Sequence, residues 1–199
     1  MSEIKAVIFD VGGVILDWEG PRKNFLNKQG ISLEEWEKGF TDSLVTRSNL
    51  GEISLDEYVR EGLRGAGIED KFEEWRKVIP GKFLPIKKTI DLSKELKKNF
   101  KIGLLTNNHK NLLEEWQEIY GQLDWFDVIV CSAEVKLVKP EREIYLLTAN
   151  KLGVKSEECL FVDDVDEYIK GARDVGMETV WFRDADLGIK EIKEKLGVV

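Results

Sequence analysis

Three apolar runs of this sequence each end in residues that could carry chemistry. The runs and the polar residues that follow them are 5–9 with Asp10, 101–105 with Thr106-Asn107-Asn108, and 159–162 with Asp163-Asp164. Apolar runs of this length are typical of buried parallel strands. Gly12 and Gly13 come just after Asp10 and would let the backbone turn and a ligand approach closely. Because neighbouring parallel strands end at one edge of a sheet, where open α/β sheets hold their ligands, we expect these polar groups to converge.

Carboxylates brought together in this way predict a bound cation. Asp10, Asp163 and Asp164 would repel one another unless a positive charge lay between them. Oxygen ligands suit Mg²⁺, which usually keeps several waters and takes only one or two carboxylates. Lys139 stands directly before Pro140, at the start of a predicted helix, and would add a positive charge for a phosphate oxygen.

Each of these residues also has a purely structural interpretation. Residues 106–108 could cap the helix that follows them, and Asp163-Asp164 could form a turn and a helix cap. Lys139 could be a solvated surface lysine. We interpret His109, the only histidine, as a residue in the first turn of an exposed helix with no functional role, because no partner for it is evident. The occurrence of the other polar residues together, at the ends of successive predicted strands, favours a functional site over these structural interpretations.

The hydrophobic pattern divides the chain that positions these residues into two parts. From about residue 21 to residue 79, apolar side chains recur at helical spacing, and capping-box sequences start at Ser32 and Ser54. We expect three or four short helices here, with the aromatic stripes as their core. After a return linker at 80–85, helices and strands alternate. The predicted helices are 86–99, 112–119, 141–152, 167–175 and 189–196, and the predicted strands are 101–106, 127–131, 159–163 and 178–182.

This alternation predicts an α/β fold. We expect a Rossmann-like parallel sheet of five strands with helices on both faces, plus a small all-helical cap inserted after the first strand. The predicted α/β core comprises residues 1–16 and 85–199, and the predicted cap comprises residues 17–84.

Composition limits the classes of partner. The 199 residues carry a net charge of −8, which argues against binding to nucleic acid or to an anionic membrane surface. Cys131 and Cys159 lie in apolar segments without a CxxC spacing, which fits a reduced, cytoplasmic setting. No apolar run approaches the length of a membrane span, and no signal region is evident. The sequence does not indicate an oligomeric state.

Five stretches also carry a resemblance to a known family. They are Phe9-Asp10-Val11-Gly12-Gly13-Val14, Leu104-Leu105-Thr106-Asn107, Lys139-Pro140, Phe161-Val162-Asp163-Asp164 and residues 171–177. In this order they resemble motifs of the haloacid dehalogenase superfamily of hydrolases with a helical cap. The run from Asp10 to Val14 is similar to that of phosphatases resembling the amino-terminal domain of soluble epoxide hydrolase. The expected strand order places the Asp10 strand at the centre, between strands 101–106 and 159–163.

The resemblance implies a role for each matched residue. Asp10 is the expected nucleophile, Thr106 a donor to the transferred phosphoryl group, and Lys139 the group that stabilises its charge. Asp10, Asp164 and Asp163 are the expected Mg²⁺ ligands, together with the backbone carbonyl of Gly12. Asn107, Gly12 and Gly13 are expected to border the substrate, with Arg22, Arg47 and Lys82 of the cap as weaker candidates for anion contacts.

Gly12 departs from the pattern of most phosphatases in that superfamily. They have a second aspartate there, which protonates the leaving alcohol and then activates water. General acid–base catalysis is typically worth about 10²–10⁴ in rate. Three outcomes stay open: hydrolysis of phosphates with good leaving groups such as sugar 1-phosphates or acyl phosphates, a proton supplied by the cap or by the 107–109 loop, or binding without turnover.

We therefore predict a Mg²⁺-dependent phosphatase acting on a small phosphorylated metabolite through an aspartyl-phosphate on Asp10. The first alternative is dehalogenation of a 2-haloacid, because a halide leaves as an anion and needs no proton. The dehalogenase branch needs no metal and lacks the paired acids, so Asp163-Asp164 favours the phosphatase. The second alternative is a module that binds phosphorylated metabolites or a protein partner without catalysis.

Overall fold

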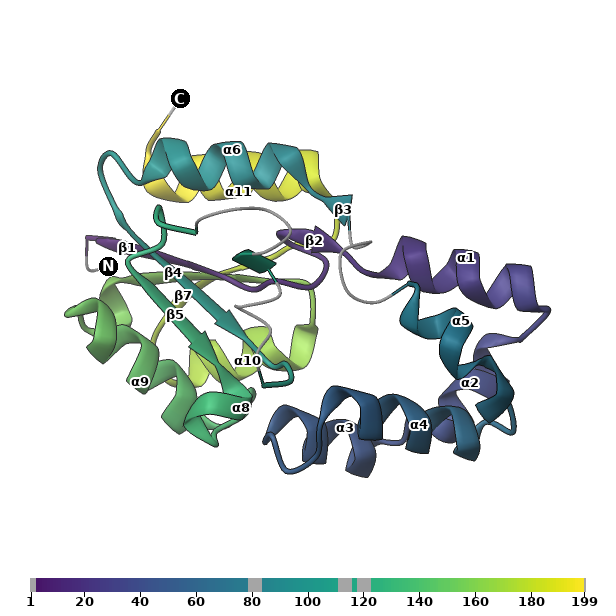
Figure 1. Cartoon of the computed structure of the whole chain (residues 1–199). Coiled ribbons are helices and arrows are strands. Elements are labelled where there is room, and N and C mark those ends of the chain that lie inside the picture. Colours follow the sequence, from purple (N-terminus) through teal and green to yellow (C-terminus); the bar gives the residue numbers. More distant parts are fainter. Residues whose placement is uncertain (1–2, 79–83, 111–115, 118–122, 199) are drawn as a thin grey trace.

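The computed structural model describes residues 3–78, 84–110, 116–117 and 123–198 (Figure 1). Five strands form a parallel sheet in the order β5-β4-β1-β6-β7. The strands are β1 (Ala6–Phe9), β4 (Lys101–Thr106), β5 (Val128–Cys131), β6 (Cys159–Asp163) and β7 (Glu178–Trp181). The predicted α/β class and the central place of the Asp10 strand are both confirmed.

Helices cover both faces of this sheet, as the alternating pattern predicts. On one face, Val7 and Phe9 of β1 pack with side chains of α6 (Lys87–Leu96) and α11 (Ala185–Leu196). On the other, Ala6 and Ile8 pack with α9 (Arg142–Leu152) and α10 (Asp166–Asp174). All four β1 side chains are fully buried. Since successive strand residues point to opposite faces, a continuous apolar run is required there.

A second, all-helical part follows β1 and lies beside the sheet in Figure 1. Its elements are α1 (Glu19–Gln29), α2 (Leu33–Gly39), α3 (Asp42–Asn49), α4 (Leu55–Gly65), the 3₁₀ turn η1 (Glu69–Lys71) and α5 (Phe72–Arg76). This part has a hydrophobic core of its own, built from Phe25, Leu26, Trp36, Val59, Leu63, Phe72 and Trp75. The predicted capping boxes form at Ser32 with Glu35 and at Ser54 with Glu57.

The helical part contains more helices than the three or four that we expect from sequence. Apolar residues recur at helical spacing from Leu33 to Leu44, and the structure divides this stretch into α2 and α3. Thr41 is the reason, because its side chain accepts a hydrogen bond from the backbone N–H of Leu44 and so caps a new helix.

Two short strands connect the two parts. β2 (Leu16–Asp17) and β3 (Leu84–Pro85) pair antiparallel, at the positions where the predicted cap begins and ends. The helical part also contacts the core at a second place, the end of α3 against the short helix α8 (Ser132–Val135). There the Ser132 hydroxyl donates to the Asn49 carbonyl at 2.6 Å, and the Lys136 ammonium donates to the Gly51 carbonyl at 3.2 Å.

Other predicted bounds shift by a few residues. The last helix starts at Ala185 instead of residue 189, because the Asp184 side chain accepts from the backbone of Asp186 and Leu187 and caps it there. Helix α8 and the 3₁₀ turn η2 (Ser156–Glu158) were not expected. Most of the predicted 112–119 helix, the linker residues 80–83 and with them Lys82 lie outside the described residues.

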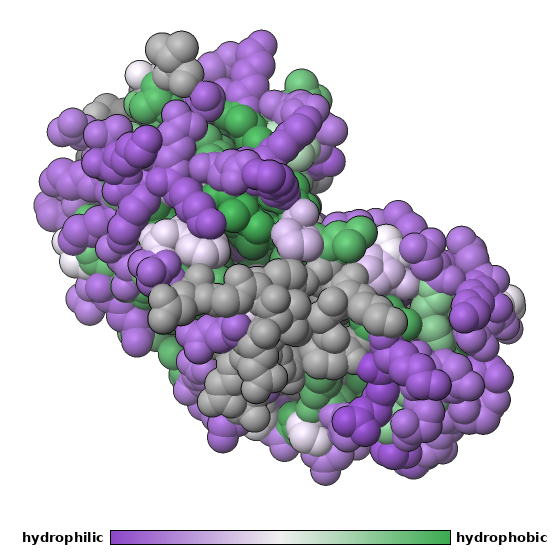
Figure 2. All heavy atoms as spheres, turned by 45° about the horizontal axis from the view of Figure 1, so that its top comes forward, coloured by the Kyte–Doolittle hydropathy of each residue, from purple (hydrophilic) through white to green (hydrophobic). Residues whose placement is uncertain are grey.

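Hydrophilic residues cover most of the face of the molecule shown in Figure 2, on both of its parts. Within the described part of the chain, no helix is both long enough and apolar enough to cross a membrane.

Candidate active site

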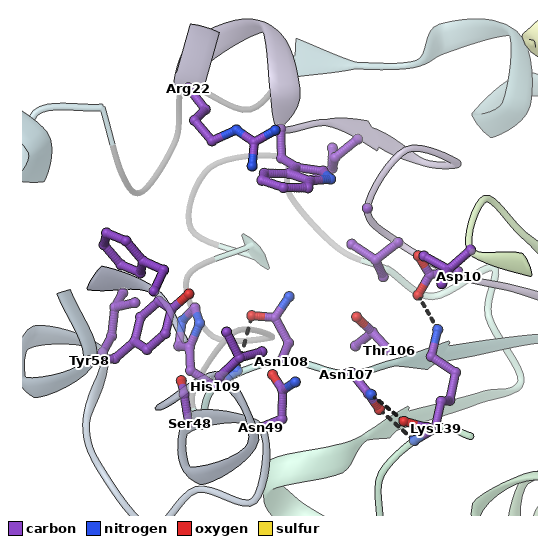
Figure 3. A pocket seen from close by; sticks show the side chains of 18 of the residues that line it. Asp10, Arg22, Ser48, Asn49, Tyr58, Thr106, Asn107, Asn108, His109 and Lys139 are labelled. Atoms are coloured by element: carbon purple, nitrogen blue, oxygen red, sulfur yellow. Dashed lines mark hydrogen bonds and ion pairs between the residues drawn. The ribbon is translucent and has the colours of Figure 1, made fainter. Parts of the chain in front are cut away.

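The carboxyl ends of β1, β4 and β6 bring the predicted residues to one edge of the sheet. Phe9 is in register with Leu104 of β4 and with Val162 of β6, so Asp10 and Asp163 extend from neighbouring strands at the same level. Carboxylate oxygens of Asp10, Asp163 and Asp164 lie within 4.8 Å of one another. Thr106, which ends β4, is buried beside them and lines the same pocket as Asp10 (Figure 3).

Lys139 lies between two of these carboxylates. Its ammonium donates to Asp10 Oδ1 at 2.7 Å and to Asp163 Oδ2 at 2.6 Å, with its side chain 1% exposed. A buried charge is tolerated only with such partners. The structure therefore places the predicted lysine next to the predicted nucleophile, although the two are 129 positions apart in the chain.

Asn107 holds the backbone of Lys139. Its amide N–H donates to the Lys139 carbonyl at 2.9 Å, and its side-chain oxygen accepts from the Lys139 N–H at 2.8 Å (Figure 3). Asn107 also lines the pocket, where we expect a substrate contact. The side-chain amide is thus engaged in positioning Lys139, a role that the sequence does not indicate.

The two neighbouring aspartates have different surroundings. Asp163 is fully buried, and its oxygens accept from the Val165 N–H at 2.8 Å and from Lys139. Asp164 is partly exposed and lines the pocket. Asp164 is therefore the more accessible of the two to a cation in the pocket, while Asp163 holds Lys139.

Burial leaves this cluster with unfavourable negative charge. Burial raises the pKa of Asp10 to about 7, against the opposing effect of Lys139. Burial and the charge of Asp163 raise the pKa of Asp164 to about 6. Burial alone would lower the pKa of Lys139, but the charges of Asp10 and Asp163 raise it above its usual value. Three acids thus face one ammonium, and a divalent cation with a preference for oxygen ligands, such as Mg²⁺, fits the donor set.

The two glycines after Asp10 make room for specific neighbours. Gly13 has a φ of +75°, and a Cβ there would lie 2.2 Å from Asp164 Oδ2. A Cβ on Gly12 would lie 3.2 Å from Cδ1 of Trp18. Glycine at these positions therefore allows the Asp164 carboxylate and the Trp18 ring to approach the loop closely.

A pocket of about 430 Å³ opens in front of these groups, between the sheet edge and the helical part. Asp10, Thr106 and Lys139 lie on one side of it in Figure 3, and Tyr58, Ser48 and His109 lie on the other. Further lining residues are aromatic side chains of the helical part, Trp18, Trp36, Phe40 and Trp75. We expected the aromatic stripes to form only a core, whereas several of these rings both pack together and face the pocket. The spacing of the aromatic residues in the sequence cannot show whether a ring packs in the core, lines the pocket or does both.

Other sequence expectations for pocket residues have mixed outcomes. His109 is buried and lines the pocket together with residues of the helical part, which corrects its expected position on an exposed helix. Arg22 lines the pocket with its guanidinium 4.3 Å from the centre of the Trp18 ring. Arg47 instead pairs with Glu61 at 2.8 Å.

Comparison with known proteins places this geometry in a family. The sequence model of a family described as haloacid dehalogenase-like hydrolase matches residues 4–176. The chain is 28% identical over 224 residues to bifunctional epoxide hydrolase 2 of Sus scrofa, which fits the predicted resemblance. That alignment covers 98% of this chain but 39% of the longer protein. Several further relatives from bacteria and a fungus are named phosphatases.

Solved structures agree with this assignment. A phosphatase from Thermococcus onnurineus is 28% identical, with a TM-score of 0.68 and 98% of each chain covered. An enzyme from Bacteroides thetaiotaomicron, solved in complex with magnesium and inorganic phosphate, shares the fold with a TM-score of 0.66 at 23% identity. That alignment covers 88% of this chain and 92% of the Bacteroides chain.

Proposed function

Because the chain belongs to the haloacid dehalogenase-like hydrolases, we propose that this hydrolase is a Mg²⁺-dependent phosphatase acting on a small phosphorylated metabolite. The observation that carries the proposal is the cluster at the end of the pocket. It combines three carboxylates within 4.8 Å of one another, one buried lysine, and an open space in front of them. Paired acids of this kind have no evident use in halide displacement.

In the proposed reaction, a carboxylate oxygen of Asp10 attacks the phosphorus atom and forms an aspartyl-phosphate. Lys139 has its ammonium 2.7 Å from that carboxylate and offers a fixed positive charge to the phosphoryl oxygens. Thr106 offers its hydroxyl from the neighbouring strand end. Water then hydrolyses the aspartyl-phosphate.

The residues that would hold Mg²⁺ are Asp10, Asp164 and the backbone carbonyl of Gly12. When bound, the ion neutralises negative charge on the transferred phosphoryl group. Asp163 keeps Lys139 in place beneath this site. The excess negative charge of the cluster in the absence of a cation supports the assignment.

We further propose that residues 17–84 act as a cap. Their helices supply the aromatic wall of the pocket, and the paired strands β2 and β3 are the connections about which they would close. Such closure excludes bulk water from the phosphoryl transfer and selects the substrate.

The test is a panel of phosphate esters, sugar phosphates and acyl phosphates, assayed with Mg²⁺ and with EDTA. We expect turnover of at least one compound that EDTA abolishes and that Asp10→Asn abolishes. Turnover retained in Asp10→Asn would exclude Asp10 as the nucleophile. An intact panel would favour a binding module. Release of chloride from chloroacetate that EDTA leaves undiminished would favour a dehalogenase.

A further inference from the structure

Trp18 fills the space next to Gly12. A Cβ on Gly12 would lie 3.2 Å from Cδ1 and 3.3 Å from Nε1 of Trp18, and 3.9 Å from Oδ2 of Asp10. A side chain on residue 12 would therefore enter the gap between the indole and the carboxylate of the proposed nucleophile. The resemblance to the superfamily implies that most of its phosphatases carry their acid–base aspartate at this position.

The fold holds the indole at this position. Trp18 directly follows β2, which β3 fixes, and it precedes the first turn of α1. Arg22, one turn along α1, lies 4.3 Å above the ring, and its guanidinium is 3.6 Å from Glu19. Cation–π stacking of this kind contributes to fixing the ring of Trp18, a residue that is 37% exposed.

The chemistry of an indole differs from that of a carboxylate. Its N–H donates a hydrogen bond but accepts none, so it can neither protonate a leaving oxygen nor remove a proton from water. The N–H groups of Trp125 and Trp181 donate to Ser93 and to the Asp164 carbonyl, whereas the Trp18 N–H has no acceptor among the described residues. It can therefore orient an oxygen atom that enters the pocket. His109 lies across the pocket, on the Tyr58 side (Figure 3).

We propose that Trp18, together with Gly12, is a specificity-determining residue that restricts this enzyme to substrates whose leaving group departs as an anion. The substrate class is acyl phosphates and the phosphate esters of phenols or enols, and the inference rests on the proposed phosphatase function. Alkyl phosphates are excluded because an alkoxide would have to leave without a proton.

The proposed steps balance without an acid at residue 12. As an Asp10 oxygen bonds to phosphorus, the bond from phosphorus to the leaving oxygen breaks, and its electron pair stays on that oxygen as a carboxylate or phenolate. Water then bonds to phosphorus, and the Asp10–phosphorus bond breaks with its electron pair returning to Asp10. A water proton passes to a phosphate oxygen of the product. Since no side chain at residue 12 assists this second step, we expect the aspartyl-phosphate to accumulate.

The experiment measures kcat/KM for acetyl phosphate, p-nitrophenyl phosphate, phenyl phosphate and n-butyl phosphate with Mg²⁺. It compares the wild type with Trp18→Ala, Gly12→Asp and the double variant. Gly12 is not among the glycines with positive φ, so its backbone accepts aspartate. We expect the wild-type value to fall by at least about 100-fold from p-nitrophenyl to n-butyl phosphate, the lower end of what a general acid contributes.

The variants test two effects separately: removing the indole from the space beside residue 12, and adding a carboxylate at residue 12. We expect both single variants to keep the steep dependence, since Trp18→Ala adds no acid and Gly12→Asp meets the indole. The double variant should raise n-butyl phosphate hydrolysis by about 100-fold relative to p-nitrophenyl phosphate. A burst of p-nitrophenolate near one per chain should appear in the wild type and diminish in the double variant.

Three results would overturn the inference. The first is wild-type hydrolysis of n-butyl phosphate within tenfold of p-nitrophenyl phosphate, by an activity that Asp10→Asn abolishes; this leaves the proposed function standing. The second is an equal gain in n-butyl phosphate hydrolysis in Gly12→Asp and in the double variant, which would show that Trp18 does not determine the specificity. The third, no turnover of any compound, would overturn the proposed function as well. If a variant fails to fold, the wild-type series still decides whether the enzyme is restricted to leaving groups that depart as anions.

Discussion

Lys139 and Asp163 form an ion pair of 2.6 Å that is closed to solvent, with their side chains 1% and 0% exposed. Breaking one side of a buried pair costs about 3–5 kcal/mol when the other charge is left without a partner. Lys139 would keep Asp10 as a second partner at 2.7 Å. We therefore predict that Asp163→Ala lowers the free energy of unfolding by about 1–3 kcal/mol, the cost of one lost partner at a buried polar group, measured by urea denaturation.

The matched control is the exposed pair of Lys195 and Glu178, whose atoms are 3.1 Å apart. Glu178→Ala should cost less than about 1 kcal/mol, because solvent screens exposed pairs. Equal losses in the two variants would contradict the importance of burial at Asp163.

Gly13→Ala should weaken Mg²⁺ binding. The new Cβ would lie 2.2 Å from Asp164 Oδ2, so the carboxylate must move. We expect at least a tenfold higher Kd for Mg²⁺ by isothermal titration calorimetry. Gly30→Ala is the control, because Gly30 has a similar φ of +69° but nothing within 4 Å of its Cβ position. Both variants carry backbone strain of roughly 1–2 kcal/mol, whereas only the first should affect Mg²⁺.

Stability of the metal-free protein should depend on pH through Asp10. Burial raises its folded-state pKa to about 7, above its ordinary value of 3.8. Between these values the folded protein binds more protons than the unfolded chain, so stability falls as pH rises. Asp10→Asn should flatten this decline in Tm between pH 4 and pH 7.

Mg²⁺ should reverse that trend, because its ligands must ionise before they bind it. The pKa of Asp164 is also raised, to about 6. We predict that saturating Mg²⁺ raises Tm more at pH 8 than at pH 5. An equal increase at both values would argue that these carboxylates do not bind the ion.

Asn107→Ala should reduce turnover more than Mg²⁺ affinity. The variant removes the two hydrogen bonds, 2.9 and 2.8 Å long, that hold the Lys139 backbone. A misplaced catalytic group can cost about 10² in rate. We expect kcat to fall by about tenfold or more in steady-state kinetics while the Mg²⁺ Kd changes less than threefold. A rise in KM alone would point instead to direct substrate contact by Asn107.

Local sequence signals determined much of this protein. Continuous apolar runs identified the buried strands, because each must be apolar on both faces. The sequence therefore predicts that the residues at the ends of β1, β4 and β6 lie at one edge of the sheet. Helix caps were equally local, since Ser32 and Glu35 interact within a single turn.

Tertiary structure alone decided the rest. Trp18 borders Gly12, Asn107 holds Lys139, and His109 is buried, yet none of these relationships has a signature in spacing. They depend on how the helical part packs against the sheet edge, which sets distances between side chains from separate elements. A short-range pattern specifies which face of an element is apolar, but only packing specifies which side chain occupies the space beside a nucleophile.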